Sequence, residues 1–244
     1  VHYNPLRNEH GRRQGAIGVA TDISDRIEHK KELSRRAHYD ELTGLPNRTL
    51  IMNQIEHAFD NARRHKKHVA VFFLDLDNFK VVNDTCGHAA GDELLKQLAS
   101  ILHEPVRDRD TVARLGGDEF GILLENCSLS KAQQIGNSLI EAVNQFQFGW
   151  SGKPFAVGAS IGLVMIDTHY HLLSDIMSAA DVACYTAKDQ GRNRLYTYHP
   201  DDESLVSRQN EMQWATRLHQ ALEENRFRLY SQTILPLKDQ DSAL

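Results

Sequence analysis

The chain has 244 residues, of which 41% are hydrophobic and 25% charged, and its net charge is −5. This length and composition suit one full domain with extensions, or two small domains. The negative charge gives no reason to expect a nucleic acid or an anionic membrane as partner. The longest strongly apolar run, Val69 to Leu74, is too short to cross a bilayer, so we expect no direct membrane contact.

Three isolated cysteines, Cys86, Cys127 and Cys184, are unsuited to a disulfide framework or a cysteine zinc site. They fit a reducing compartment, so we expect the chain to be cytoplasmic. The sequence opens in polar residues without the apolar core of a signal peptide, and it begins and ends in mid-pattern. We therefore expect a fragment of a longer protein, whose membrane attachment, if any, lies outside this chain.

The N-terminal segment is predicted to be the end of a sheet, with a hairpin turn at Gly11 and a returning strand from Ala16 to Ile23. A charged helix is expected from about Asp25 to Ala37, capped by Asp22 or Ser24. Its apolar stripe is thin, which fits a signalling connector and a solvated linker equally well.

Helix-like and strand-like segments follow one another through the middle of the chain. In order, we expect a helix capped by Asn47, a buried strand Val69–Leu76, a helix with an apolar face from Leu94 to Leu102, a hairpin with arms Thr111–Leu115 and Phe120–Leu124, a helix between Lys131 and Phe146, a strand Phe155–Ile166, a helix Leu172–Lys188 and a strand Arg194–Tyr198. A hairpin among crossovers implies an α+β fold with a central mixed sheet surrounded by helices. Beyond His199-Pro200 the pattern changes to a helix starting near Leu205 and a strand from Phe227.

Three carboxylates are expected to converge at one edge of this sheet. Asp75 and Asp77 end the apolar run VAVFFLDLD, while Asp118 and Glu119 follow a two-glycine turn between the hairpin arms. Taken alone, Asp75 could equally mark the point where the strand leaves the core and enters solvent. If the hairpin pairs beside this strand, the side chains of Asp75, Asp118 and Glu119 meet, and such hard oxygen ligands suit Mg²⁺ or Mn²⁺.

Four motifs resemble those of GGDEF diguanylate cyclases in order and spacing: DELTGLPNR (Asp40–Arg48), LDLDNFKVVNDTCGHAAGD (Leu74–Asp92), RLGGDEF (Arg114–Phe120) and AKDQGRNR (Ala187–Arg194). The resemblance implies a nucleotidyl-cyclase, palm-like fold with the GGDEF signature at a β-hairpin turn. It also implies that two GTP molecules condense into cyclic di-GMP and two pyrophosphates, in a homodimer of such domains.

The resemblance also assigns roles to single residues. Two Mg²⁺ or Mn²⁺ ions per active site are implied, with Asp118 and Glu119 catalytic and the metal held by Asp75, the Leu76 carbonyl, Asp118 and Glu119. Asp118 is expected to promote deprotonation of the 3′-hydroxyl. The GTP contacts implied are Asn78, Phe79, Lys80, Asn83, Asp92, Gly116, Gly117, Lys188 and Arg192.

Side-chain chemistry agrees with these roles, although simpler explanations exist. The Asp92 carboxylate can accept from guanine N1–H and N2–H₂, and the Asn83 amide can donate to ring acceptors. Lys188 and Arg192 suit phosphate. The alternatives are a turn asparagine, a first-turn helix aspartate and a cationic helix C-terminus.

The family's product-inhibition motif, RxxD, falls on Arg107 and Asp110, within RDRD. A charged loop is the alternative. Ser138 stands where some members have a second arginine, so cyclic di-GMP is expected to bind there more weakly or with a different geometry.

The flanks also resemble known modules. We expect residues 1–23 to end a PAS domain, 24–38 to form a helical linker, 39–199 the GGDEF domain, and 200–244 a linker and the truncated start of an EAL domain. The alternative to an active cyclase is a catalytically silent module that binds GTP or cyclic di-GMP and controls an adjacent EAL phosphodiesterase.

Overall fold

The computed structural model describes residues 2–7, 9–19, 24–65, 67–166, 170 and 172–200. The helix predicted near Leu205 and the strand predicted from Phe227 lie outside these residues. So do Asp22 and the last four residues of the predicted returning strand, 20–23.

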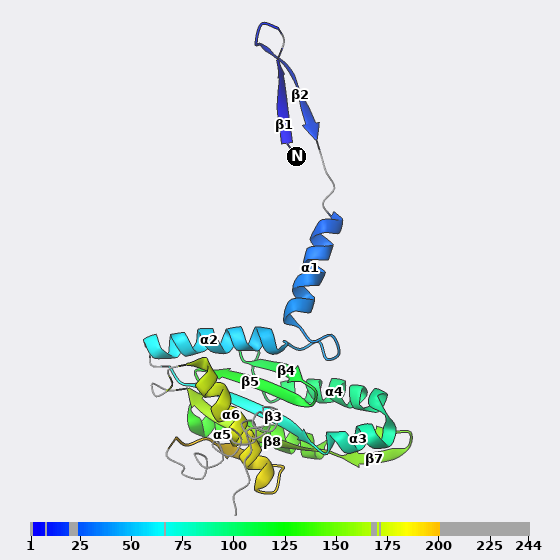
Figure 1. Cartoon of the computed structure of the whole chain (residues 1–244), viewed down its shortest axis with the longest axis vertical. Helices are drawn as coiled ribbons and strands as arrows, with labels where there is room; N and C mark the ends of the chain where they lie inside the picture. Colours follow the sequence, from blue (N-terminus) through cyan, green and yellow to red (C-terminus); the bar gives the residue numbers. More distant parts are fainter. Residues whose placement is uncertain are drawn as a thin grey trace, which may run out of the picture. The chain divides into compact units, whose positions relative to one another are not determined.

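Five strands form one mixed sheet in the order β4-β5-β3-β8-β9 (Figure 1). Their bounds are β3 (Val69–Asp77), β4 (Thr111–Gly116), β5 (Glu119–Glu125), β8 (Gly158–Ile166) and β9 (Leu195–Thr197). Neighbouring strands are antiparallel except β8 and β9, which are parallel. The predicted α+β fold with a central mixed sheet is confirmed.

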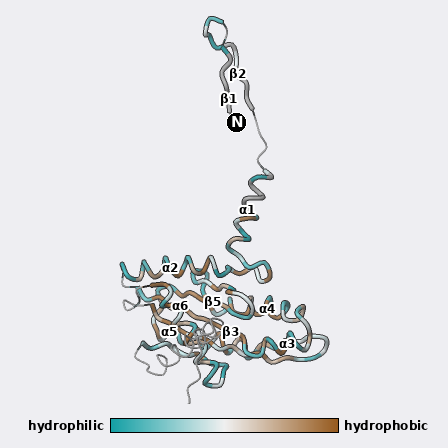
Figure 2. Tube along the Cα trace, viewed as in Figure 1, coloured by the Kyte–Doolittle hydropathy of each residue, from teal (hydrophilic) through white to brown (hydrophobic). Residues whose placement is uncertain are grey.

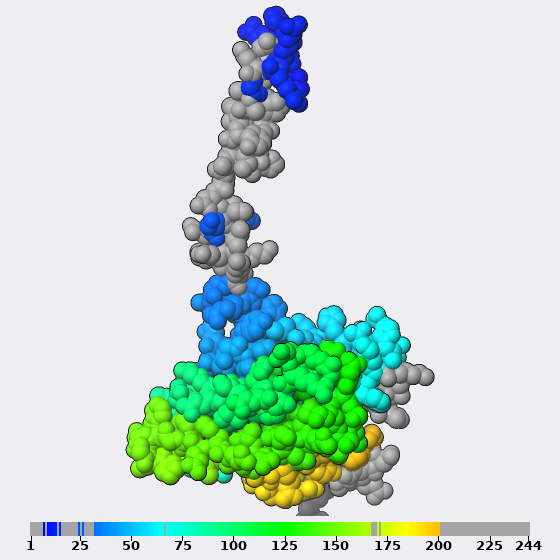
Figure 3. All heavy atoms as spheres, turned by 180° about the vertical axis from the view of Figure 1, so that it is seen from behind, coloured from blue at the N-terminus to red at the C-terminus, as the bar shows by residue number. Residues whose placement is uncertain are grey.

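Helices cover both faces of this sheet: α2 (Arg48–His65), α3 (Phe79–Cys86), α4 (His88–His103), α5 (Leu129–Gln145) and α6 (Leu173–Asp189). Successive strand residues face opposite sides, so Val71 packs in the core formed with α2 and α6, while Phe72 and Leu74 pack in the core formed with α4 and α5. In the view from behind, the segment from α4 to β7 forms most of the visible surface of the coloured domain (Figure 3).

Helix α2 begins where the sequence places its N-cap. The Asn47 Oδ1 accepts a hydrogen bond from the Leu50 N–H at 3.1 Å, which satisfies one of the free donors of the first turn. Its buried residues, Ile51 and Ile55 among them, recur at helical spacing, and hydrophilic and hydrophobic residues alternate along the helix in Figure 2. None of the helices in the described part of the chain is both long and apolar enough to cross a membrane.

The N-terminal residues form an antiparallel hairpin, β1 (His2–Arg7) and β2 (Arg13–Val19). Gly11 turns it with φ 74°, a conformation that glycine adopts without strain. The returning strand therefore starts at Arg13 rather than at the predicted Ala16. Helix α1 (Ser24–His38) follows, close to the expected bounds.

Helix α3 was not among the elements predicted from the sequence. Asn78 takes the left-handed conformation (φ 66°) directly after β3, and the helix starts at Phe79. Only Val82 of α3 is buried, so the short helix leaves no apolar periodicity to detect. Its β-branched residues also favour strands over helices.

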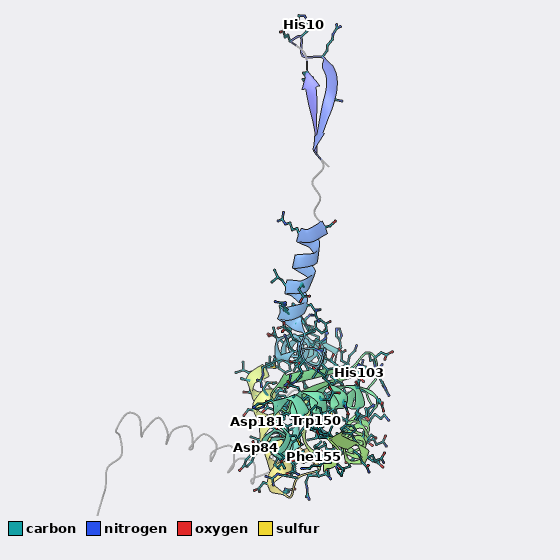
Figure 4. The ribbon with its side chains drawn as sticks, turned by 90° about the vertical axis from the view of Figure 1, so that its right-hand side faces the viewer. His10, Asp84, His103, Trp150, Phe155 and Asp181 are labelled. Atoms are coloured by element: carbon teal, nitrogen blue, oxygen red, sulfur yellow. The ribbon has the colours of Figure 1, made fainter. Side chains whose placement is uncertain are left out.

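The predicted strand Phe155–Ile166 is two strands. Its first residues belong to β7 (Lys153–Ala156), which pairs with β6 (Gln147–Trp150) in a separate hairpin. Phe148 anchors this hairpin, because the rings of Trp150 and Phe155 lie 6.1 and 6.4 Å from its own; both are labelled in Figure 4. The unbroken β-prone sequence hides the break before Gly158.

Substituting Gly162 tests the packing of α6 on the sheet. A Cβ at this β8 glycine would overlap the Cys184 nitrogen and the Ala180 oxygen of α6, and backbone cannot move aside as a side chain can. We expect Gly162→Ala to lower the free energy of unfolding by about 3 kcal/mol, measured by urea denaturation. Gly149→Ala on β6, where a Cβ would meet nothing within 4 Å, should change it by less than about 0.5 kcal/mol. Equal effects would contradict this account.

Candidate active site

The acidic corner lies where β3 ends beside the β4–β5 turn. Cross-strand pairing sets Asp75 opposite Glu119, and the Leu76 N–H donates to the Asp118 carbonyl at 3.2 Å. Gly116 (φ 142°) and Gly117 (φ 52°) make the turn in conformations that other residues rarely adopt. The three carboxylate residues named from the sequence thus lie on adjoining backbone.

Two of these carboxylates have cationic neighbours from the helices on the same face. The Lys188 Nζ of α6 lies 2.6 Å from Asp75 Oδ2, and the Arg48 Nη2 of α2 lies 3.4 Å from Glu119 Oε2. Asp75 lies four residues from Val71 on β3, and Glu119 lies four residues from Leu123 on β5, so all four face the same side of the sheet, the side covered by α2 and α6. This shared face explains why the cations of both helices can reach the corner.

Burial and crowding shift the acid–base properties of the corner. Burial raises the pKa of Asp75, and the charges of Asp118 and Glu119 raise it further, against the hydrogen bond and charge of Lys188. Although burial alone would lower it, contact with Asp75 holds the pKa of Lys188 above its usual range. A cluster of carboxylates of this kind is stabilised by added positive charge.

The corner has the chemistry of a divalent metal site. Its side-chain donors, from Asp75, Asp118 and Glu119, are hard oxygens of the type that Mg²⁺ and Mn²⁺ prefer. The Lys188 ammonium beside Asp75 shows that the corner accepts a cation. Within the described residues, no three His, Cys, Asp or Glu side chains surround a common point, and Mg²⁺ usually takes one or two carboxylates and completes its shell with waters and substrate phosphates.

A loop rich in positive φ angles borders the other side of the β3 end. Asp77 is buried and accepts hydrogen bonds from Ser160 Oγ (2.9 Å) and the Asn193 N–H (2.9 Å). The predicted phosphate ligand Arg192 lies near it, with Nε 3.9 Å from Asp77 Oδ1. Asp77 therefore ties the AKDQGRNR segment to the strand that carries Asp75. An open cavity of about 340 Å³ adjoins it, lined in part by Asn78, Gly191 and these two loop residues.

The predicted guanine ligands lie on two helices that contact each other. Asn83 is in α3 and Asp92 in α4. The Asn83 side chain packs against Gly91, the residue before Asp92. The structure thus brings the two together, although Asp92 is exposed and Asn83 half-buried. Phe79 also packs here, half-buried, and Lys80 is exposed.

Of the two residues predicted to bind the product, Asp110 is buried and Arg107 is exposed. The buried Asp110 carboxylate accepts a hydrogen bond from the Glu125 N–H at 3.1 Å, and its own N–H donates to the Arg107 carbonyl. The Arg107 and Ser138 side chains are exposed. Asp110 therefore has a structural role at the end of β5 whatever it binds.

Three further residues hold the turn, and none of them was predicted from the sequence to be a site residue. The Arg114 guanidinium donates to the Gly117 carbonyl (2.8 and 3.1 Å) and to both oxygens of Asp40 (3.1 Å each). Arg48 reaches the Leu115 carbonyl at 3.3 Å as well as Glu119. All three stand inside the quoted motifs, which is the one signal that could have identified them.

The sequence of residues 37–194 matches the family described as diguanylate cyclase, GGDEF domain. The chain therefore belongs to the GGDEF family. It is 41% identical over 210 residues to "Probable diguanylate cyclase DgcE" of Escherichia coli, covering 85% of this chain but 19% of DgcE.

Solved structures show the same fold. The GGDEF domain of TpbB from Pseudomonas aeruginosa is 35% identical with a TM-score of 0.65, covering 70% of this chain and 99% of that one. The coiled coil and GGDEF domain of DgcB from Caulobacter crescentus, solved in complex with c-di-GMP, is 26% identical with a TM-score of 0.67, covering 72% and 93%.

The Asp40–Arg114 contact generates a pH prediction. Although burial opposes the shift, hydrogen bonds from Thr43 and Arg114 hold the pKa of Asp40 below its ordinary 3.8. A lowered pKa in the folded state stabilises the fold above the unfolded pKa, and this contribution is lost as the pH falls through about 4 and below. Asp40→Asn should therefore cost about 1–2 kcal/mol at pH 7, and the difference from wild type should shrink towards pH 3.

Chemical denaturation at a series of pH values measures this difference. Asp108→Asn, at an exposed position, is the control and should change stability little at any pH. A cost of Asp40→Asn that stays constant from pH 7 to pH 3 would refute the assignment.

Proposed function

We propose that residues 39–199 form a diguanylate cyclase domain that condenses two GTP molecules into cyclic di-GMP. The observation that carries the proposal is the register of β3 and β5, which sets Asp75 opposite Glu119 with Asp118 at the glycine turn. Membership of the GGDEF family supports it. Lys188 lies beside Asp75 and Arg192 near Asp77, and both cations have the chemistry to bind the phosphates of GTP.

Each group of residues has a proposed task. Asp75, Asp118, Glu119 and the Leu76 carbonyl would hold two Mg²⁺ or Mn²⁺ ions, which when bound activate the 3′-hydroxyl and stabilise the leaving pyrophosphate. Asp118 also promotes loss of the hydroxyl proton. The remaining contacts bind GTP: Asn83 and Asp92 the guanine, Lys188 and Arg192 the phosphates, and Asn78, Phe79, Lys80, Gly116 and Gly117 the nucleotide through close backbone approach.

The reaction needs two copies of the domain, because each site binds one GTP. With two domains apposed antiparallel, the 3′-oxygen of each GTP attacks the α-phosphate of the other. Two phosphodiester bonds form, two bonds to pyrophosphate break and two hydroxyl protons leave. Positioning and electrostatic stabilisation supply most of the acceleration, since the protein forms no covalent bond to the substrate.

The remaining proposals concern regulation. We place a site for the product at Arg107 and Asp110; that a GGDEF relative, DgcB, was solved in complex with c-di-GMP supports product binding by a domain of this fold. We place the end of a PAS domain at 1–23, a helical linker at 24–38, and the start of an EAL domain within 200–244. The chain spans only 19% of the length of DgcE. The activity of a full-length protein that contains this chain is therefore also a proposal.

Incubating the chain with GTP and Mg²⁺ tests the activity, with cyclic di-GMP and pyrophosphate measured by chromatography. Glu119→Gln should reduce turnover at least about a hundredfold, because the substitution removes a charge from the metal cage. Its side chain is 50% exposed and its contact with Arg48 is 3.4 Å long, so the melting temperature should change little. Glu125→Gln, at the exposed far end of β5, should remain active. Tight GTP binding without product from the wild type would instead identify a regulatory module.

Lys188 should compete with metal for Asp75. Lys188→Met removes the ammonium, so in the absence of nucleotide Mn²⁺ should bind about fivefold more tightly, a gain of about 1 kcal/mol. GTP should bind more weakly, because a phosphate ligand is lost. Paramagnetic titration measures the metal, and Lys96→Met on α4, which pairs with Glu93, should leave it unchanged. Weaker Mn²⁺ binding by Lys188→Met would contradict the competition.

A further inference from the structure

Helix α4 contains a glycine, Gly91, as its fourth residue. Glycine favours a helix interior less than alanine does. Gly91 is buried and has no left-handed φ that would require glycine. The reason for glycine at this position is therefore space rather than backbone conformation.

The side chains of α3 fill that space. A Cβ placed at Gly91 would overlap Asn83 Oδ1, come within 2.9 Å of Asn83 Cγ, and lie 3.1 Å from Phe79 Cζ. The absent side chain thus leaves a notch in α4 that the Asn83 amide occupies. Gly91 directly precedes Asp92, so the notch brings the amide beside the second predicted guanine ligand.

The notch also determines which end of the amide is available. Asn83 Oδ1 is buried and has no hydrogen-bond partner among the described residues. The reverse orientation would bury the NH₂ group, with two donors, in place of one acceptor. The Nδ2 group is therefore the end left to meet a ligand, as a hydrogen-bond donor.

We propose that Gly91 is a positioning residue for nucleobase recognition. Because it has no side chain, the Asn83 amide packs against the α4 backbone at this position, which holds the Asn83 Nδ2 next to Asp92. The proposal rests on the proposed function, in which these two side chains bind guanine. Gly91 itself touches no substrate atom. Its contribution is the fixed direction of one hydrogen-bond donor.

The variant Gly91→Ala tests the proposal by direct binding. The new Cβ meets the far end of a flexible side chain, so Asn83 is displaced while the helix stays. We expect the Kd of a non-hydrolysable GTP analogue with Mg²⁺ to rise about tenfold, or about 1.4 kcal/mol, in calorimetric titration. The melting temperature should equal or exceed that of the wild type, since alanine favours helix. A lower melting temperature would mean that the helix gives way, and would overturn the proposal.

A double-mutant cycle with Asn83→Ala separates positioning from a general structural effect. Because Gly91 acts through Asn83, the double variant should bind no more weakly than Asn83→Ala alone. Losses that multiply to about a hundredfold, or a Gly91→Ala variant that binds as the wild type does, would overturn the proposal.

Gly136, a buried glycine in α5, provides the matched control. A Cβ there would meet the Leu195 side chain at 2.9 and 3.0 Å and Phe72 at 3.3 Å, so Gly136→Ala should lower the melting temperature and leave GTP binding unchanged. The binding cycle is also independent of turnover. A chain that shows the cycle but makes no cyclic di-GMP supports the role of Gly91 and refutes the cyclase. A chain that makes product while Asn83→Ala and Gly91→Ala bind normally does the reverse.

Discussion

The antiparallel pairing of β3 with β5 is the constraint on which the acidic corner depends. Strand side chains alternate between faces, so a slip of one residue would turn Glu119 to the opposite face and bring Phe120 beside Asp75. The register is held at its end by the Leu76 N–H bond to the Asp118 carbonyl. The glycine turn joins β4 to β5, and because it needs positive φ at both glycines, no ordinary pair of residues would make this connection at low cost.

Gathering carboxylates at one corner is unfavourable unless positive charge lies close. In this domain each cation comes from an element other than the one that carries its carboxylate. The pairs are Lys188 of α6 with Asp75 of β3, Arg48 of α2 with Glu119 of β5, and Arg114 of β4 with Asp40 of the first loop. The ion pairs of the corner therefore connect α2 and α6, which cover one face of the sheet, to β5 and β3. This arrangement explains why the site needs a complete domain rather than a local motif.

Sequence patterns predicted the long elements well and the short ones poorly. The mixed sheet, the N-cap at Asn47 and the helices α4, α5 and α6 follow from apolar periodicity, which reports the burial of one face. Helix α3 buries a single side chain, and the break before Gly158 depends on tertiary neighbours, so neither leaves a periodic signal. The candidate site residues came from motifs, and the register of β3 with β5 places Asp75 opposite Glu119. The hydrogen bonds of Asp77 and Arg114 and the space left by Gly91 were found only in the structure, because a contact between two elements leaves no pattern in a single sequence.

The loop between α1 and α2, residues 39–47, is connected by hydrogen bonds both to the end of α1 and to the strand that supports the glycine turn. Asn47 donates through its N–H to the His38 carbonyl and through Nδ2 to the Ala37 carbonyl, at the end of α1. It also forms a β-bridge with Arg114, whose side chain holds the Gly117 carbonyl. A change in the path of the chain at the end of α1 must therefore break these hydrogen bonds or displace the strand that carries Arg114. Either change alters the support of the turn on which Asp118 and Glu119 stand.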